Sequence, residues 1–230
     1  MNWTTDDLKD QTGKTILITG ANTGLGFQTA LELAKKNVTV IMAGRSDTKI
    51  KEAIQEIKAQ YPAAKLEAGI IDLSDLSSVK KFAEGMLSKH RQLDVLINNA
   101  GVMFPPPSKT KDGYELQFGV NFLAHFALTA HLFPLLKATQ NSRVVTLSSI
   151  AHKNGKMDFE NLKLEKPYDK FREYGQSKVA DLIFALEMQR RLEKGDATTI
   201  SVAAHPGISK TELLRTDNPA MINEFPHMSA

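Results

Sequence analysis

The 230-residue sequence contains no cysteine, so a disulfide framework and a thiolate metal site are both excluded. A chain without disulfides fits a reducing compartment, and we expect a cytoplasmic location. The sequence also lacks a cluster of carboxylates and histidines spaced as metal ligands, so we expect no metal.

Long apolar runs and a strong excess of one charge are absent as well. Residues 1–14 are polar and contain no apolar stretch of the kind found in a signal peptide. The longest apolar region, 122–136, is interrupted by His125, His131 and Pro134. A membrane span needs about 20 apolar residues, so we expect a buried helix here and no span. The net charge of +3 is small and well mixed, so nucleic acid is not expected as a partner.

The remaining composition is typical of one globular α/β domain over residues 1–230, with 42% hydrophobic and 24% charged residues. Short β-branched runs alternate with amphipathic stretches, which indicates βαβ units around a parallel sheet. We expect strands at 15–19, 38–42, 65–71, 94–97, 143–147 and 199–203. We expect helices at 27–36, 47–60, 76–90, 114–136 with a break near Pro134, and 174–193 ending at Gly195. The predicted fold is a doubly wound parallel sheet of at least six strands, with helices on both faces.

A glycine-rich segment, 19–26 (TGANTGLG), joins the first expected strand to the first helix. Glycines let a backbone turn sharply and approach a ligand closely, and a helix N-terminus attracts an anion. We therefore expect this turn to hold the pyrophosphate of a dinucleotide through Gly20, Asn22, Thr23, Gly24, Leu25 and Gly26. An ordinary glycine-rich turn is the alternative, because the spacing G-x-x-x-G-x-G differs from the G-x-G-x-x-G fingerprint.

The end of the second strand discriminates between cofactors. An NAD site usually places a carboxylate there for the ribose hydroxyls, whereas this sequence has Arg45 and Ser46. Arg45 can bind a 2′-phosphate through two N–H groups, and Ser46 can add a hydroxyl donor. The expected cofactor is therefore NADP (NADPH) rather than NAD. The alternative is that Arg45 is a solvated loop residue.

Tyr174 precedes Lys178 by four residues, a spacing that puts both side chains on one face of a helix. A free tyrosine has a pKa of about 10, and a neighbouring ammonium favours its phenolate. Tyr174 could then exchange a proton with an alcohol or carbonyl. Tyr61 and Lys65 have the same spacing, but Pro62 disfavours a helix there and the segment leads into a strand. We therefore choose Tyr174.

In these motifs the chain resembles the classical short-chain dehydrogenase/reductase family, and within it the branch of retinol dehydrogenases and WW-domain oxidoreductases. The matching stretches recur in the family's order over nearly the whole chain: 19–26, 98–101 (NNAG), Ser148-Ser149, 174–178 (YGQSK) and Pro206-Gly207. The resemblance implies a single NAD(P)-binding Rossmann domain.

The resemblance also implies roles for individual residues. Asp72, followed by Leu73, would accept from the adenine amino group, and Asn98, Ala100 and Gly101 would close the fourth strand's end against the cofactor. Asn121 would hold a water that links Lys178 to solvent, and Ser149 would bind the substrate oxygen. Tyr174 and Lys178 would also touch the nicotinamide ribose. Pro206, Gly207 and Thr211 would lie near the nicotinamide and phosphates.

Independently of the resemblance, most of these residues follow strands, and open α/β sheets bind ligands at the carboxyl ends of their strands. Structural alternatives stay open for several. Asn99 could merely satisfy a turn, Ser148 could be a core hydroxyl, and Asn121 could bond within its own helix. His152 and His205 need no chemical role.

Between Ser149 and Tyr174 lies a long insertion that is similar to that of the retinol dehydrogenase branch. Its apolar side chains, with two from the loop after the fourth strand, could wall a substrate pocket or simply pack the loop onto the domain. They are Met103, Phe104, Met157, Phe159, Leu162, Leu164, Tyr168 and Phe171. A lipophilic substrate follows by analogy with that branch.

The expected function is NADP-dependent hydride transfer between nicotinamide and a small carbonyl or alcohol substrate. The family usually continues beyond Thr211 through a lid, a helix and a last strand, whereas this chain ends at Ala230. The expected lack of that segment favours the alternative of a non-catalytic NADP-binding sensor or scaffold, while Ser149, Tyr174 and Lys178 argue against it. A homo-oligomer is left open. A protochlorophyllide reductase relative is not expected, because that enzyme type uses a cysteine as proton source.

Overall fold

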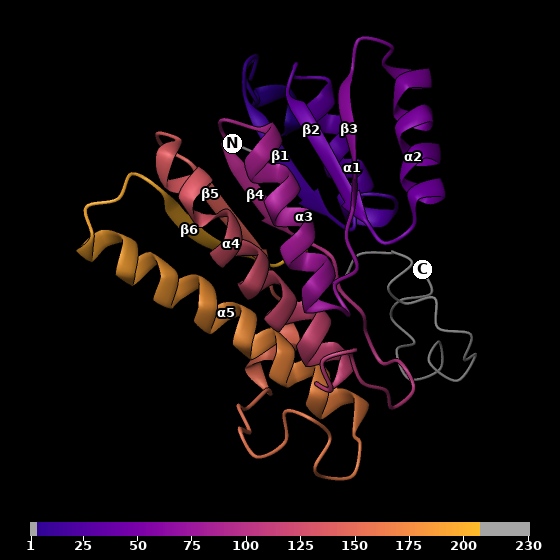
Figure 1. Cartoon of the computed structure of the whole chain (residues 1–230), viewed down its shortest axis with the longest axis vertical. Coiled ribbons are helices and arrows are strands. Elements are labelled where there is room, and N and C mark those ends of the chain that lie inside the picture. Colours follow the sequence, from indigo (N-terminus) through magenta and orange to yellow (C-terminus); the bar gives the residue numbers. More distant parts are fainter. Residues whose placement is uncertain (1–3, 208–230) are drawn as a thin grey trace.

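The computed structural model describes residues 4–207, in which six parallel strands form one sheet. The strands are β1 (Thr15–Thr19), β2 (Thr39–Gly44), β3 (Lys65–Ile70), β4 (Val95–Asn98), β5 (Arg143–Leu147) and β6 (Ile200–Ala204). Their spatial order is β3-β2-β1-β4-β5-β6 (Figure 1). The direction of winding reverses between β1 and β4, and sheets of this topology bind ligands beyond the carboxyl ends of the strands at that point. The predicted doubly wound sheet is confirmed.

Helices cover both faces of the sheet, because strand residues alternate between two apolar cores. The first face is covered by α1 (Gly24–Ala34) and α2 (Asp47–Gln60), which bury Ile16 and Ile18. The opposite face carries α3 (Leu76–Lys89), α4 (Ala124–Ala138) and α5 (Lys170–Lys194), which lie in front of the sheet in Figure 1. There Leu17 and Leu96 are fully buried in the second core. Because all six strands pair in parallel between these layers, their carboxyl ends lie together at one edge of the sheet.

Two helices begin earlier than the sequence pattern predicts. The first helix begins at Gly24 rather than at Phe27, so part of the glycine-rich turn forms the first turn of α1. The last begins at Lys170 rather than at Tyr174. The physical reason is a cap at Asp169, whose carboxylate accepts the backbone N–H groups of Phe171 and Arg172. Tyr174 therefore lies inside α5, where both of its neighbouring turns are fixed.

The break predicted near Pro134 is wrong. The helix continues through Pro134 to Ala138, and Leu132, Leu135 and Leu136 are buried on either side of it. A proline near the end of a helix removes only one backbone bond, which the packing of these leucines offsets. The irregular turn lies at the other end of the helix, in the π-helical segment η2 (Phe118–Leu123).

The combined helix, Phe118–Ala138, is long and apolar enough to cross a membrane by length and composition. In this fold 56% of its most apolar window is buried, against α3 on one side and α5 on the other. Such burial is typical of the core helix that the sequence analysis expects. Among residues 4–207 it is the only helix with these properties.

Candidate functional site

The glycine-rich turn after β1 is folded tightly on itself. Gly20 and Gly24 have φ angles of 66° and 56°, in the left-handed region that glycine adopts without strain. A Cβ on Gly26 would lie 2.3 Å from the carbonyl oxygen of Gly20, so a larger residue cannot replace it without moving the turn. The first turn of α1 leaves backbone N–H groups without helical acceptors. These features fit a cradle for the pyrophosphate of a dinucleotide.

Thr19 and Asn99 bind the glycine-rich turn to the end of β4. The Thr19 hydroxyl oxygen accepts the backbone N–H groups of Asn99 and Ala100, each at 3.0 Å. The Asn99 side chain donates to the Thr19 carbonyl at 2.8 Å. The turn-satisfying role of Asn99 is thus confirmed. The segment 98–101 and the phosphate cradle, far apart in sequence, lie side by side.

Arg45 follows β2 beside this cradle. A Cβ on Gly44 would lie 3.3 Å from the side-chain oxygen of Asn22, so the glycine-rich turn and the end of β2 are adjacent. Arg45 is exposed and has no hydrogen bond or ion pair within residues 4–207. Ser46 caps α2 by accepting the N–H of Lys49 at 3.3 Å, which leaves its hydroxyl hydrogen free to donate. The Arg45 guanidinium and the Ser46 hydroxyl are thus both available to bind an anion.

The remaining residues predicted to contact the cofactor differ in which of their atoms a ligand could reach. Asp72 accepts the N–H and hydroxyl of Ser74 through one carboxylate oxygen, at 2.9 and 2.6 Å. Leu73 is a core residue, so a ligand could reach its main chain rather than its side chain. Asn98 also points inward and donates to Thr129 at 3.1 Å. Its role as a side-chain ligand of the cofactor stays a prediction.

Pro206 and Gly207 follow β6 and are exposed. Gly207 has a φ angle of 72°, and its N–H donates to His205 at 3.3 Å. This contact supports a local, structural reading of His205. Thr211, the other contact predicted in this segment, lies outside the described residues.

Tyr174 and Lys178 lie on one face of α5, as their spacing predicts. The Lys178 ammonium is 5.9 Å from the centre of the Tyr174 ring. Both residues are 6% exposed. The ammonium donates to the Leu147 carbonyl at the end of β5, at 2.9 Å, and to the Asp181 carboxylate at 2.8 Å. A buried positive charge is therefore held next to a phenol.

Ser149 lies just beyond Leu147, at the start of the short helix η3 (Ile150–Lys153). Its hydroxyl oxygen accepts the N–H of Ala151 at 3.3 Å, which leaves the hydroxyl hydrogen free to donate. Ser148, by contrast, is buried and donates to the Lys178 carbonyl at 2.8 Å, which confirms its reading as a core hydroxyl. The end of β5 thus brings Ser149, Lys178 and Tyr174 to the same edge of the sheet.

Asn121 lies in the π-helical turn and is buried. Its side chain accepts the N–H of Val102 at 2.8 Å and donates to the Val102 carbonyl and to the Ser177 hydroxyl, both at 3.0 Å. The partners of these bonds lie outside the helix that carries Asn121, so the alternative that its side chain bonds within its own helix is wrong. Asn121 joins the loop after β4 to α5. Its expected water-holding role stays a prediction.

His125 is a site residue that sequence reasoning missed. It is 1% exposed, and its two ring nitrogens bond to the Asn121 carbonyl at 2.7 Å and to the Thr19 hydroxyl at 2.8 Å. Burial is the main cause that lowers the pKa of His125 to about 4, and the positive charge of Lys178 contributes to this lowering. The neutral ring thus connects the turn that carries Asn121 to the phosphate cradle. The available signals were its spacing of four residues from Asn121 and its place within an otherwise apolar stretch.

A cavity of about 570 Å³ opens beside Tyr174. Of the insertion's apolar residues, Met157 and Phe171 line it, together with Phe104, whose ring packs edge-on against Tyr174 with centroids 5.4 Å apart. Phe159 is instead 76% exposed. The wall also contains polar residues, among them Asn154, Lys156 and Asp158. The pocket reading therefore holds for part of the set only.

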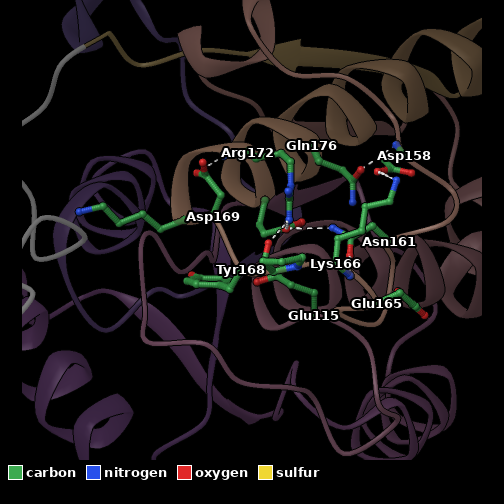
Figure 2. A network of polar contacts seen from close by, with 12 residues as sticks. Glu115, Asp158, Asn161, Glu165, Lys166, Tyr168, Asp169, Arg172 and Gln176 are labelled. Carbon is green, nitrogen blue, oxygen red and sulfur yellow. Dashed lines mark hydrogen bonds and ion pairs between the residues drawn. The ribbon is translucent and has the colours of Figure 1, made fainter.

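A polar network folds the insertion against α5 (Figure 2). Asn161 is fully buried, donates to the Glu173 carboxylate at 3.0 Å and accepts the N–H of Lys166 at 2.8 Å. The Tyr168 hydroxyl donates to the carbonyl of Pro105 at 2.6 Å. Burial is the main cause that raises the pKa of Tyr168 to about 12, so it stays a donor. The cavity wall is thereby held by specific bonds, as well as by apolar packing.

His125 provides a test of this arrangement through acid stability. Because its pKa is about 4 in the fold and 6.5 in the unfolded chain, acid favours unfolding as pH falls below 6.5. We expect the wild type to lose about 3 kcal/mol of unfolding free energy relative to His125→Gln between pH 7.5 and 4. Urea denaturation at each pH measures this difference. His131 is an exposed histidine on the same helix, and His131→Gln should leave the pH dependence of the unfolding free energy as it is in the wild type. Equal pH dependence in all three proteins would contradict a buried neutral His125.

Comparison with known proteins places this geometry in a family. The model of the short chain dehydrogenase family matches residues 14–221. Retinol dehydrogenase 13 of Mus musculus is 45% identical over 204 residues, covering 88% of this chain and 60% of that protein. Retinol dehydrogenase 12 of Homo sapiens is also 45% identical, over 203 residues, with 88% and 64% covered. The chain thus spans about three fifths of the length of these curated relatives.

A solved structure agrees with the sequence match. The crystal structure of an uncharacterised protein from Mycobacterium Paratuberculosis is 43% identical, with a TM-score of 0.82 over 96% of this chain and 76% of the other. The fold, the ordered motifs and these similarities lead to one conclusion: the chain belongs to the short-chain dehydrogenase family and, within it, is similar to the retinol dehydrogenases.

Proposed function

We propose that this protein is an NADP-dependent oxidoreductase that interconverts an alcohol and a carbonyl compound, with Tyr174 as the general acid and base. The observation that carries the proposal is the buried ammonium of Lys178, 5.9 Å from the Tyr174 ring at the edge of a cavity. A positive charge at this distance favours the phenolate over the phenol. Tyr174 can then accept the proton of an alcohol or return it to a carbonyl oxygen.

Each neighbouring group has a separate task in this proposal. When bound, the nicotinamide cofactor supplies or accepts the hydride. The free hydroxyl hydrogen of Ser149 donates to the substrate oxygen and orients it toward Tyr174. Asn121 fixes the loop after β4 against α5, and so preserves the geometry of the edge. Phe104 and Phe171, whose ring centroids are 4.6 Å apart, form one apolar side of the cavity.

The substrate class follows from the relatives and from the cavity wall. The similar dehydrogenases are named for retinol, and apolar side chains line part of the cavity in this protein. We therefore take lipophilic primary alcohols and their aldehydes as substrates, with retinol as the first to test. The polar residues Asn154 and Lys156 also line this cavity.

Replacing Tyr174 by phenylalanine tests the proton-transfer role. Loss of the hydroxyl should lower kcat for retinol oxidation roughly 100- to 10,000-fold while NADPH binding stays nearly unchanged. The matched control is Tyr61→Phe, which has the same sequence spacing to a lysine but lies at the end of α2. Initial rates and nucleotide binding by calorimetry measure both effects. Wild-type rates in Tyr174→Phe would remove the phenol from the mechanism, and nucleotide binding without turnover by the wild type would favour a sensor.

The choice of NADP rests on Arg45, which is exposed beside the phosphate cradle without a partner in residues 4–207. Arg45→Asp should shift the ratio of the NADPH and NADH dissociation constants toward NADH by about tenfold or more, because a carboxylate repels the 2′-phosphate. Lys58→Asp makes the same charge change near the far end of α2 and should leave the ratio unchanged. An unchanged ratio in Arg45→Asp would mean that Arg45 is a solvated loop residue.

A further inference from the structure

The Lys178 ammonium has an acidic partner that the proposed proton transfer does not require. Asp181 lies on α5 one helical turn beyond Lys178, and one of its oxygens accepts from the ammonium at 2.8 Å. The Asp181 side chain is 1% exposed, and its second oxygen is buried without a hydrogen-bond partner among residues 4–207. Burying an incompletely bonded carboxylate is costly, so its charge requires an explanation.

The carboxylate acts on both the position and the field of the ammonium. With the Leu147 carbonyl, it fixes two of the three N–H groups of Lys178. It also brings a negative charge close to the positive one, so the pair attracts a phenolate less than a lone ammonium would. The rest of the site therefore experiences a partly neutralised Lys178.

Within residues 4–207, few other charges face the pair, and the π-helical turn η2, which packs on α5, carries none. From α5 itself Tyr174 lies beside Lys178, and from α4 comes His125, which the fold keeps neutral above pH 4. The short helix η3, which packs on α5, carries His152 and Lys153, and His152 is bonded to the Ser149 carbonyl. The strand β6 contains no titratable residue, and the single one in β5 is Arg143 at its opposite end. Asp181 is thus the anion closest to Lys178.

Asp181 itself can change charge in an accessible pH range. Burial raises the pKa of Asp181 to about 6, against the opposing effect of Lys178. Its carboxylate is therefore ionised at neutral pH and loses its charge in mild acid.

We propose that Asp181 is a positioning residue of the active site, whose carboxylate holds the Lys178 ammonium against β5 and offsets part of its charge at the Tyr174 phenol. The inference rests on the proposed role of Tyr174 in proton transfer. It states that the acidity of the phenol is set by a lysine–aspartate pair rather than by the lysine alone.

The test is Asp181→Asn, which keeps a short oxygen acceptor for Lys178 and removes the charge. Without the carboxylate, the uncompensated ammonium favours the phenolate more strongly. We expect the acid limb of the pH profile of kcat for retinol oxidation with NADP to move by roughly one pH unit to lower pH. Glu193→Gln removes an exposed negative charge from the same helix and should leave the limb in place.

A second measurement does not depend on turnover. The ultraviolet absorbance of phenolate is followed with pH, and the same protein with Tyr174→Phe is subtracted so that only Tyr174 is observed. Its phenolate should appear at lower pH in Asp181→Asn than in the wild type, by the same shift. A wild type inactive on retinol and on a panel of carbonyls would defeat the proposed function, while this titration would still decide the role of Asp181.

Asp181→Ser is a second neutral variant should the asparagine variant fail to fold, and the same shift is expected from it. A lower kcat with an unmoved acid limb and an unmoved phenolate titration would overturn the proposal, because it would reduce Asp181 to a packing role. Failure of both variants to fold, judged by thermal melting, would also overturn it by making Asp181 a determinant of folding.

Discussion

A buried ammonium must be bonded and neutralised, and in this protein that requirement determines the arrangement of the site. Lys178 is anchored by the Leu147 carbonyl at the end of β5 and by Asp181 on its own helix. Because both anchors belong to the sheet–helix framework, the charge cannot move without disturbing the fold. Tyr174, one turn before Lys178, is thereby held beside a fixed positive charge. The chemistry proposed for the phenol depends on this constraint.

On the cofactor side of the site, hydrogen bonds likewise link the ends of neighbouring strands. Thr19 at the end of β1 accepts two N–H groups from the loop after β4, and it also contacts His125. His125 in turn bonds to the carbonyl of Asn121, whose side chain reaches α5 through Ser177. A continuous chain of buried bonds therefore joins the phosphate cradle to the helix that carries the phenol. Buried hydrogen-bond networks of this kind rigidify the interior of a protein.

The sequence allowed prediction of the features that repeat along the chain, namely the alternating strands and helices and the residues at strand ends. It also distinguished Tyr174 from Tyr61, because a proline and a following strand are local signals. Features that depend on three-dimensional neighbours could not be predicted. His125 looks like an ordinary helix residue until the fold brings it to Thr19, and the spacing of Asp181 from Lys178 on one helix does not reveal that the pair is buried. The continuity of α4 through Pro134 likewise depends on packing rather than on propensity.

The central claim, that this edge of the sheet supports hydride transfer, is tested most directly by isotope transfer. NADPH in which both hydrogens on the reacting carbon of the nicotinamide are replaced by deuterium would be incubated with retinaldehyde and the full-length protein. Hydride transfer at this edge predicts a retinol product heavier by one deuterium, with the hydroxyl proton taken from solvent. Retinol formed without the label, or no retinol at any enzyme concentration while NADPH binds, would contradict it.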